Sequence, residues 1–282
     1  MKNIRIHVLI ITAILRLITS GFKDQNFLGS PLIPFLFKLT PKKYRRSLAL
    51  RLIGISPHYF IYQYTTRYPA TMSRKEILEA EHRRNSSSRS QICEKILKRW
   101  LQPHMDVLDF GCGLGYLARE AAKYSKNVVA VDVSCGVIAC AKELNSSSNI
   151  SYYVNDGKCL SMLDGSTIDL IYSFAVVQHL SEELFEGILK EFFRVLKPQG
   201  KVICHITLSD QPFTKSEHKI NSFVTRFIKK RILLDMHLRT LEDVRQKIIK
   251  AGFKEPNIIL AKQICDIEDD IVKQHLFIFS KL

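Results

Sequence analysis

The chain has 282 residues, of which 46% are hydrophobic and 24% charged, and its formal net charge is +15. Such a composition can bury a sizeable core, which excludes a disordered or fibrous chain. The seven cysteines are odd in number and contain no C-x-x-C pair, which argues against a disulfide framework and a structural zinc site. We therefore expect a cytoplasmic globular protein with reduced thiols and no bound metal.

The positive charge is concentrated near the N-terminus. Residues 1–51 contain ten Lys or Arg and one acidic residue, whereas residues 103–206 contain nine basic and twelve acidic residues. An apolar run over residues 6–15 ends at Arg16 and is too short to span a bilayer, so we expect neither a cleaved signal nor a membrane span. Apolar and basic residues alternate over residues 1–55. This mixture fits an anionic membrane surface, and equally fits helices that pack on the core with solvated basic faces.

A helix is predicted upstream of the acidic region. Ser88 and Gln91 match a capping box, and apolar residues follow them at helical spacing. These residues are Ile92, Ile96, Leu97 and Leu101. We expect this helix to begin near Ser88, after a serine loop, and we divide the chain into a helical extension (residues 1–85) and a main domain (residues 86–282).

Three alternate glycines follow the first clear strand, Val107–Phe110, in which Asp109 is the acidic residue. The glycines are Gly111, Gly113 and Gly115, and helical spacing begins directly after them. Glycine lets the backbone turn tightly and approach a ligand closely. A nicotinamide or flavin fingerprint would need glycine where this chain has Tyr116. The register therefore indicates a different nucleotide-type cofactor.

Further strands alternate with helices, and polar residues follow several of them. A strand over residues 128–131 ends at Asp132 and Val133, one over residues 150–154 precedes Asp156 and Gly157, and one over residues 168–180 contains Phe174 and ends near His179. The later predicted elements are a helix stripe from Leu184 to Leu196, a strand over residues 202–206, a helix capped by Thr240 and Gly252, and strands over residues 257–264 and 275–279. This alternation predicts an α/β, doubly wound parallel sheet.

The run D-x-G-x-G-x-G with these later acids resembles class I S-adenosylmethionine (SAM) dependent methyltransferases. The resemblance implies a Rossmann-like, seven-stranded, mostly parallel sheet with two antiparallel closing strands, and SAM as the cofactor. It also implies site roles. The methionine and ribose side of SAM would be held by Asp109, Gly111, Gly113 and Gly115. The ribose would be held by Asp132 and Val133, and the adenine by Asp156 and Gly157. Phe174 and His179 would face the methyl group. The family's L-K-P-G-G turn has a glycine where this chain has Gln199.

The acceptor is predicted from what surrounds this core. Residues 173–176 lack the paired prolines of the methyltransferases that modify nucleic-acid bases, which disfavours nucleic acid as a partner. Aromatic and apolar residues over 58–68, and over an expected lid insertion at residues 207–239, favour a small lipophilic or aromatic acceptor. His179 would act as a base if the nucleophile carries a proton. Two alternatives stay open, a SAM-binding regulatory protein without turnover and an RNA or protein methyltransferase.

Overall fold

The computed structural model describes residues 28–55, 68–69, 71–210, 236–265 and 274–281. The apolar run at residues 6–15, most of the aromatic cluster at 58–68 and most of the lid insertion at 207–239 lie outside the described residues. The N-terminal extension can be followed from residue 28 onward, with the interruptions given above.

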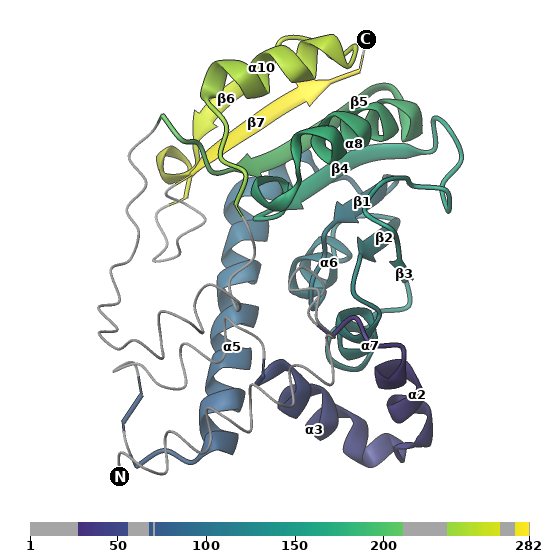
Figure 1. The fold of residues 1–282 in the computed structure, drawn as a ribbon, viewed down its shortest axis with the longest axis vertical. Coiled ribbons are helices and arrows are strands. Elements are labelled where there is room, and N and C mark those ends of the chain that lie inside the picture. Colours follow the sequence, from purple (N-terminus) through teal and green to yellow (C-terminus); the bar gives the residue numbers. More distant parts are fainter. Residues whose placement is uncertain (1–27, 56–67, 70, 211–235, 266–273, 282) are drawn as a thin grey trace.

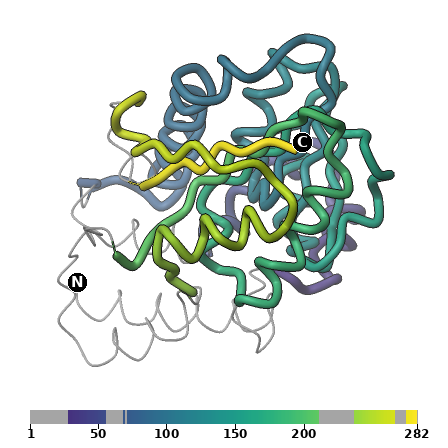
Figure 2. The backbone as a smooth tube through the Cα atoms, turned by 90° about the horizontal axis from the view of Figure 1, so that it is seen from above, coloured from purple at the N-terminus to yellow at the C-terminus, as the bar shows by residue number. Residues whose placement is uncertain are grey.

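Seven strands form one sheet in the order β3-β2-β1-β4-β5-β7-β6. The strands are β1 (Asp106–Phe110), β2 (Asn127–Asp132), β3 (Ile150–Val154), β4 (Ile168–Phe174), β5 (Leu196–Ile206), β6 (Asn257–Leu260) and β7 (His275–Ser280). The pairs among β1 to β5 are parallel, while β7 pairs antiparallel with both β5 and β6. Figure 2 shows these two closing strands, in yellow, running side by side. The predicted fold class is confirmed.

The central strands β1 and β4 are buried on both faces, which explains why they are mostly apolar. Along β1, Val107 belongs to one core cluster and Leu108 to another, because successive side chains point to opposite faces. The first cluster includes residues of α6 (Tyr116–Ala121) and α7 (Cys135–Leu144), and the second includes residues of α8 (Glu182–Val195) and α10 (Leu241–Lys250). Figure 1 shows α8 and α10 together at the β4–β7 end of the sheet.

The ends of the later helices follow the predicted signals. Ser181 caps α8 by accepting a hydrogen bond from the Leu184 amide, and Thr240 caps α10 by accepting one from the Asp243 amide. Gly252 follows α10 with a φ of 98°, a conformation that glycine adopts without strain. The predicted starts of α8 and α10 therefore agree with the structure. The strand predicted over residues 202–206 begins earlier, at Leu196, and the one predicted over residues 257–264 ends at Leu260, where a 3-10 turn follows.

The prediction that a helix begins at Ser88 was wrong. Helix α5 spans Arg74–Ile92 and is capped by a box formed by Ser73 and Glu76. A short π-helical turn, η1 (Cys93–Leu97), and a 3-10 turn, η2 (Lys98–Trp100), continue it. No glycine or proline interrupts residues 74–92, so the serine run stays helical. The helix passes residues 85 and 86 without a break, and the domain division at that point stays a prediction.

Two helices of the N-terminal extension lie beside α7, one of the helices that cover the sheet. These are α2 (Leu32–Leu39) and α3 (Lys42–Ile53), which pack with α7 through a small core that includes Ile33, Phe37, Ile53 and Val137. Figure 1 shows both, in purple, at the end of the molecule opposite β6 and β7. Among the helices that the structure describes, none has the length and apolar character needed to cross a bilayer.

Candidate cofactor and acceptor site

The glycine turn lies where the strand order reverses, between β1 and β4. In doubly wound sheets this crevice, outside the carboxyl ends of the strands, is where ligands bind. The amides of Gly111 and Cys112 both donate to the Val131 carbonyl, each at 2.9 Å, which fastens the turn to β2. Gly111, Gly113 and Gly115 all have positive φ, at 75°, 52° and 74°. The backbone therefore takes the left-handed turns that the alternate glycines predicted.

Asp132 holds this turn from the end of β2. Its Oδ2 accepts a hydrogen bond from the Gly113 amide at 3.0 Å, and its Oδ1 accepts one from the Ser134 amide at 3.0 Å. Burial raises the pKa of Asp132, while these backbone N–H groups oppose the rise. Each oxygen keeps a second lone pair, so the carboxylate can still accept hydrogen bonds from a ribose diol.

Asp109 is buried at the end of β1, with 3% of its surface exposed. Its Oδ2 has no hydrogen-bond partner within the described part of the chain. Burial raises the pKa of Asp109 to about 8 and the Asp132 carboxylate adds to the rise, while the nearby Tyr172 hydroxyl and Ala118 amide oppose it. A buried oxygen without a partner is costly, and a bound cationic group would satisfy it. The ammonium of a methionine moiety is a group of this kind.

The adenine-side residues meet at the tips of β2 and β3. Val133 is exposed to 39%, and a Cβ built on Gly157 would lie 3.1 Å from Val133 Cγ1. Asp156 is exposed, and its Oδ1 accepts the amides of Lys158 and Cys159 at 2.8 and 3.0 Å. These amides hold the pKa of Asp156 below its ordinary value. Val133 thus exposes an apolar side chain at this tip, while one Asp156 oxygen is used within its own loop.

The residues predicted to face the methyl group lie at the end of β4 and just after it. Phe174 stacks on His205 with ring centroids 5.9 Å apart, and the His205 Nδ1 accepts a hydrogen bond from the Ala175 amide at 3.2 Å. Ala175 has a φ of 61°, a strained conformation for a residue with a Cβ, and such strain often marks functional sites. The predicted fourth strand ends at Phe174, and His179 closes a 3-10 turn, η3 (Val177–His179).

A buried arginine that the sequence analysis did not single out anchors this acceptor loop. Arg239 is 4% exposed, and its guanidinium donates to the carbonyls of Val177 and Leu180 at 3.2 and 2.6 Å. Glu182 Oε1 lies 2.7 Å from Arg239 Nε, and the guanidinium lies 4.6 Å from the centre of the Phe185 ring. Arg239 therefore joins both sides of η3 to the segment before α10. Sequence alone could not separate it from the many exposed arginines.

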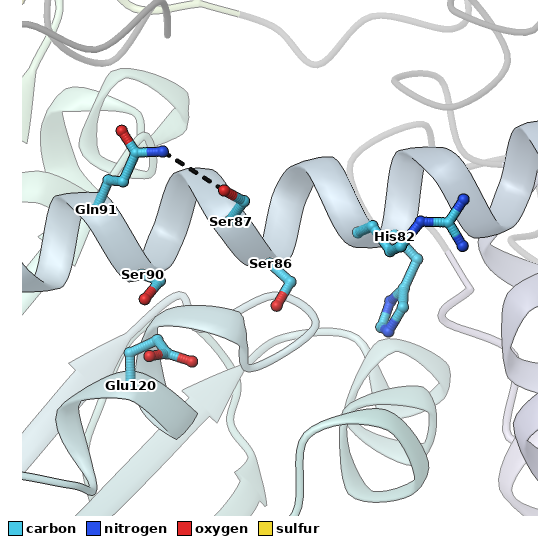
Figure 3. A pocket seen from close by; sticks show the side chains of 7 residues that line it. His82, Ser86, Ser87, Ser90, Gln91 and Glu120 are labelled. Carbon is cyan, nitrogen blue, oxygen red and sulfur yellow. Dashed lines mark hydrogen bonds between the residues drawn. The ribbon is translucent and has the colours of Figure 1, made fainter.

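A second contact unpredicted from sequence connects α5 to the glycine turn. Tyr116 follows Gly115 directly, and its hydroxyl is hydrogen-bonded to His82 Nδ1 at 2.7 Å. Burial lowers the pKa of His82, which favours the neutral ring. Next to this pair lies an open polar pocket of about 390 Å³ between α5 and α6 (Figure 3). None of the predicted site residues lines this pocket.

The residues at the crevice fit SAM. The unpartnered oxygen of Asp109 suits an ammonium, and the half-buried Asp132 suits a diol. A Cβ built on Gly113 would meet no atom within 4 Å, so this glycine borders open space rather than protein. No group of three or more His, Cys, Asp and Glu side chains suited to a metal occurs among the described residues. The fold and site define a doubly wound α/β protein built to bind a nucleoside-containing cofactor.

Comparisons with known proteins give the family. A family model described as "Methyltransferase domain" matches residues 108–204. The chain is 30% identical over 194 residues to phosphoethanolamine N-methyltransferase 1 of Zea mays, covering 67% of this chain and 35% of that protein. It is 34% identical over 115 residues to the ribosomal protein L11 methyltransferase of Thermosipho africanus, covering 40% of this chain and 42% of that protein.

A solved structure shares the fold. The SAM-dependent methyltransferase from Mesorhizobium loti superposes with a TM-score of 0.52 at 16% identity, covering 70% of this chain and 100% of that one. The chain contains a methyltransferase domain over residues 108–204 and has the fold of the class I SAM-dependent methyltransferases, enzymes that use SAM. It spans about a third of the length of the phosphoethanolamine N-methyltransferases that it matches.

Proposed function

We propose that this protein transfers the methyl group of SAM to a small acceptor with a lipophilic or aromatic part. The observation that carries the proposal is the Asp132 carboxylate, whose two oxygens hold the glycine turn through the Gly113 and Ser134 amides next to the open space at Gly113. It stands at the crevice where the family binds its cofactor. The small acceptor is supported by the Zea mays relative, whose name specifies phosphoethanolamine, a small molecule.

Each end of the cofactor would have its own residues. Asp109 would accept from the ammonium of the methionine moiety, Asp132 from the ribose hydroxyls, and Val133 with Gly157 would lie against the adenine. The turn of Gly111, Gly113 and Gly115 would let the backbone approach the cofactor closely. When bound, SAM supplies an electrophilic methyl group for in-line displacement. The protein's main contribution is then to hold the acceptor aligned and to exclude water.

The acceptor would be held between the end of β4 and the segment before α10. Phe174 and the apolar side chains of Met236 and Leu238, exposed to 43% and 42%, support a lipophilic part in the acceptor. The His237 amide donates to the Gln178 carbonyl at 2.7 Å, so this segment lies directly beside η3. Whether the acceptor is lipophilic is tested by comparing phenols and amphiphiles with phosphoethanolamine.

His179 is the proposed base. Imidazole is the side chain best suited to accept a proton near neutral pH, and an N–H or O–H nucleophile must lose one. We expect His179→Gln to lower kcat about a hundredfold or more while leaving the affinity for SAM unchanged. The measurement is the initial rate of methyl transfer from labelled SAM to the best acceptor found, beside calorimetric titration with S-adenosylhomocysteine.

Three outcomes would count against these proposals. A His179→Gln variant with unchanged kcat would show that the histidine is structural. SAM binding without transfer to any phenol, lipid extract or phosphoethanolamine would favour the regulatory alternative instead. Salt-dependent binding of RNA that requires the basic residues 1–51 would favour an RNA methyltransferase.

We also propose that the protein is cytoplasmic and associates peripherally with a membrane through residues 1–55. The support is the charge distribution, since ten of the basic residues fall within residues 1–51 while the cofactor domain carries an acidic excess over residues 103–206. Nucleic-acid enzymes more often place their basic residues around the cleft.

A further inference from the structure

Helix α2 exposes an apolar face. Four of its side chains, at positions 32, 35, 36 and 39, follow the spacing of one helix face. Leu32 is exposed to 65%, Phe35 to 56%, Leu36 to 42% and Leu39 to 66%. A solvent-facing helix surface normally carries polar residues, so a row of four large apolar side chains indicates an interaction surface.

The opposite face of α2 is already used by the fold. Ile33 and Phe37 are 3% and 5% exposed and pack in the core that α2 shares with α3 and α7. The Gly136 amide of α7 donates to the Leu28 carbonyl at 3.0 Å, just before α2. These contacts fix α2 on α7. Its apolar outer face therefore stays toward solvent.

The chain segment that carries this face is basic. Residues 28–55 contain six Lys or Arg and no acidic residue. Arg45 and Arg46 are engaged with Glu143 and Glu79, at 3.5 and 2.7 Å. Lys38, Lys42 and Lys43 are exposed, and none of them forms an ion pair with another described residue. Lys42 is only three residues from Leu39, so the two Cα atoms lie within about 11 Å of each other.

We propose that the outer face of α2, with Lys38, Lys42 and Lys43, is a docking surface for an anionic lipid bilayer. Apolar side chains at the acyl boundary and lysines at the phosphate level are the arrangement by which interfacial helices bind membranes. A protein partner fits less well, because this surface offers no particular shape for a partner to match and its charged side chains are all lysines. The proposal deepens the peripheral association above and rests on it.

The position of the surface gives the proposed function a substrate class. Helix α2 packs on α7, and α7 begins at Cys135, three residues after Asp132 of the cofactor site. Figure 1 shows α2 and α3 beside α7, away from the closing strands. Docking would bring the cofactor end of the domain close to the bilayer, so the acceptor would be an amphiphile held in the membrane.

The test is flotation of the full-length protein with vesicles of phosphatidylcholine alone or with about a third phosphatidylserine. Wild type should float with the anionic vesicles. The Leu32→Ser/Phe35→Ser/Leu39→Ser variant should bind at least about tenfold more weakly, since these side chains would leave the acyl boundary. Lys38→Gln/Lys42→Gln/Lys43→Gln should lose binding by about fivefold per lysine, and added salt should weaken the wild type similarly.

Matched controls separate this surface from general stickiness. Tyr153→Ser/Val154→Ser removes two other exposed apolar side chains, and Lys254→Gln/Lys262→Gln removes two other exposed lysines. Both should float like wild type. Equal flotation of the α2 variant and wild type would overturn the proposal. So would self-association that the α2 variant abolishes in a protein that binds no vesicle.

The same samples are titrated with S-adenosylhomocysteine. Because the α2 substitutions lie on an exposed face, their cofactor affinity and thermal unfolding should match wild type. Cofactor binding without flotation would overturn the docking surface and leave the methyltransferase proposal intact. Flotation without cofactor binding would overturn the methyltransferase proposal and leave the docking surface intact.

Discussion

Asp109→Asn should make the cofactor-free protein more stable at pH 8 than wild type, and yet weaken its binding of SAM. In the free protein, burial raises the pKa of Asp109 from its ordinary value of 3.8 to about 8. Neutral asparagine keeps the shape of the side chain without the cost of a buried charge. The cation of SAM, however, would lose a charged acceptor, which costs roughly tenfold to a hundredfold in affinity.

The pH dependence identifies the group. A carboxyl whose folded pKa is raised contributes stability that is complete below its unfolded pKa of 3.8 and is lost as the pH rises through about 8. Between pH 5 and pH 8 the loss from this one group should be about 3.5 kcal/mol. Urea unfolding of wild type and variant at both pH values should therefore give free-energy differences that change by that amount. A difference independent of pH, or equal SAM affinity of the two proteins, would contradict the role of Asp109.

Gly111→Ala should damage both the fold and the site. At a φ of 75°, an alanine Cβ would lie 2.3 Å from Val176 Cγ2. Left-handed backbone costs an alanine about 1–2 kcal/mol, and the forced displacement of Val176 adds about 1–3 kcal/mol. Because Val176 belongs to the loop that carries η3, SAM binding and methyl transfer should fall together. Urea unfolding and calorimetric titration measure the two effects.

Gly113→Ala is the matched control for this prediction. Its φ is 52°, and an added Cβ would meet no protein atom within 4 Å. We expect the smaller strain of about 1–2 kcal/mol alone, so the Gly113 variant should be the more stable of the two. Its SAM affinity should still fall, since the methyl group would occupy space left for the cofactor. Equal unfolding free energies for the two variants would show that Val176 is not a rigid neighbour.

The strand-and-acid pattern was predictable because local rules determine it. An apolar run of five to seven residues that ends in glycine or an acid is typical of a buried strand that meets a turn, and parallel strands bring such ends to one edge. For this reason Asp109, Asp132 and the three glycines meet as predicted. Their roles toward SAM stay predictions.

Other features depend on packing that no local pattern contains. The helix start predicted at Ser88 was wrong because the same spacing of polar residues also occurs inside a continuous helix. That helix has Ser73 as its N-cap. Arg239 is buried only because the turn at Val177 and Leu180 offers it carbonyls from a distant part of the chain. Asp156 turns toward its own loop because it accepts hydrogen bonds from backbone amides. Such amides occur in every sequence, so no residue pattern indicates this contact.

The central claim is that the crevice between β1 and β4 binds SAM through Asp132 and its neighbours. Calorimetric titration of the full-length protein with S-adenosylhomocysteine tests it most directly, since this product keeps the ammonium and ribose and cannot react. We predict one site per chain, and at least about a hundredfold weaker binding by Asp132→Ala, which removes two charge-assisted acceptors. No binding, or binding that Asp132→Ala leaves unchanged, would contradict the account.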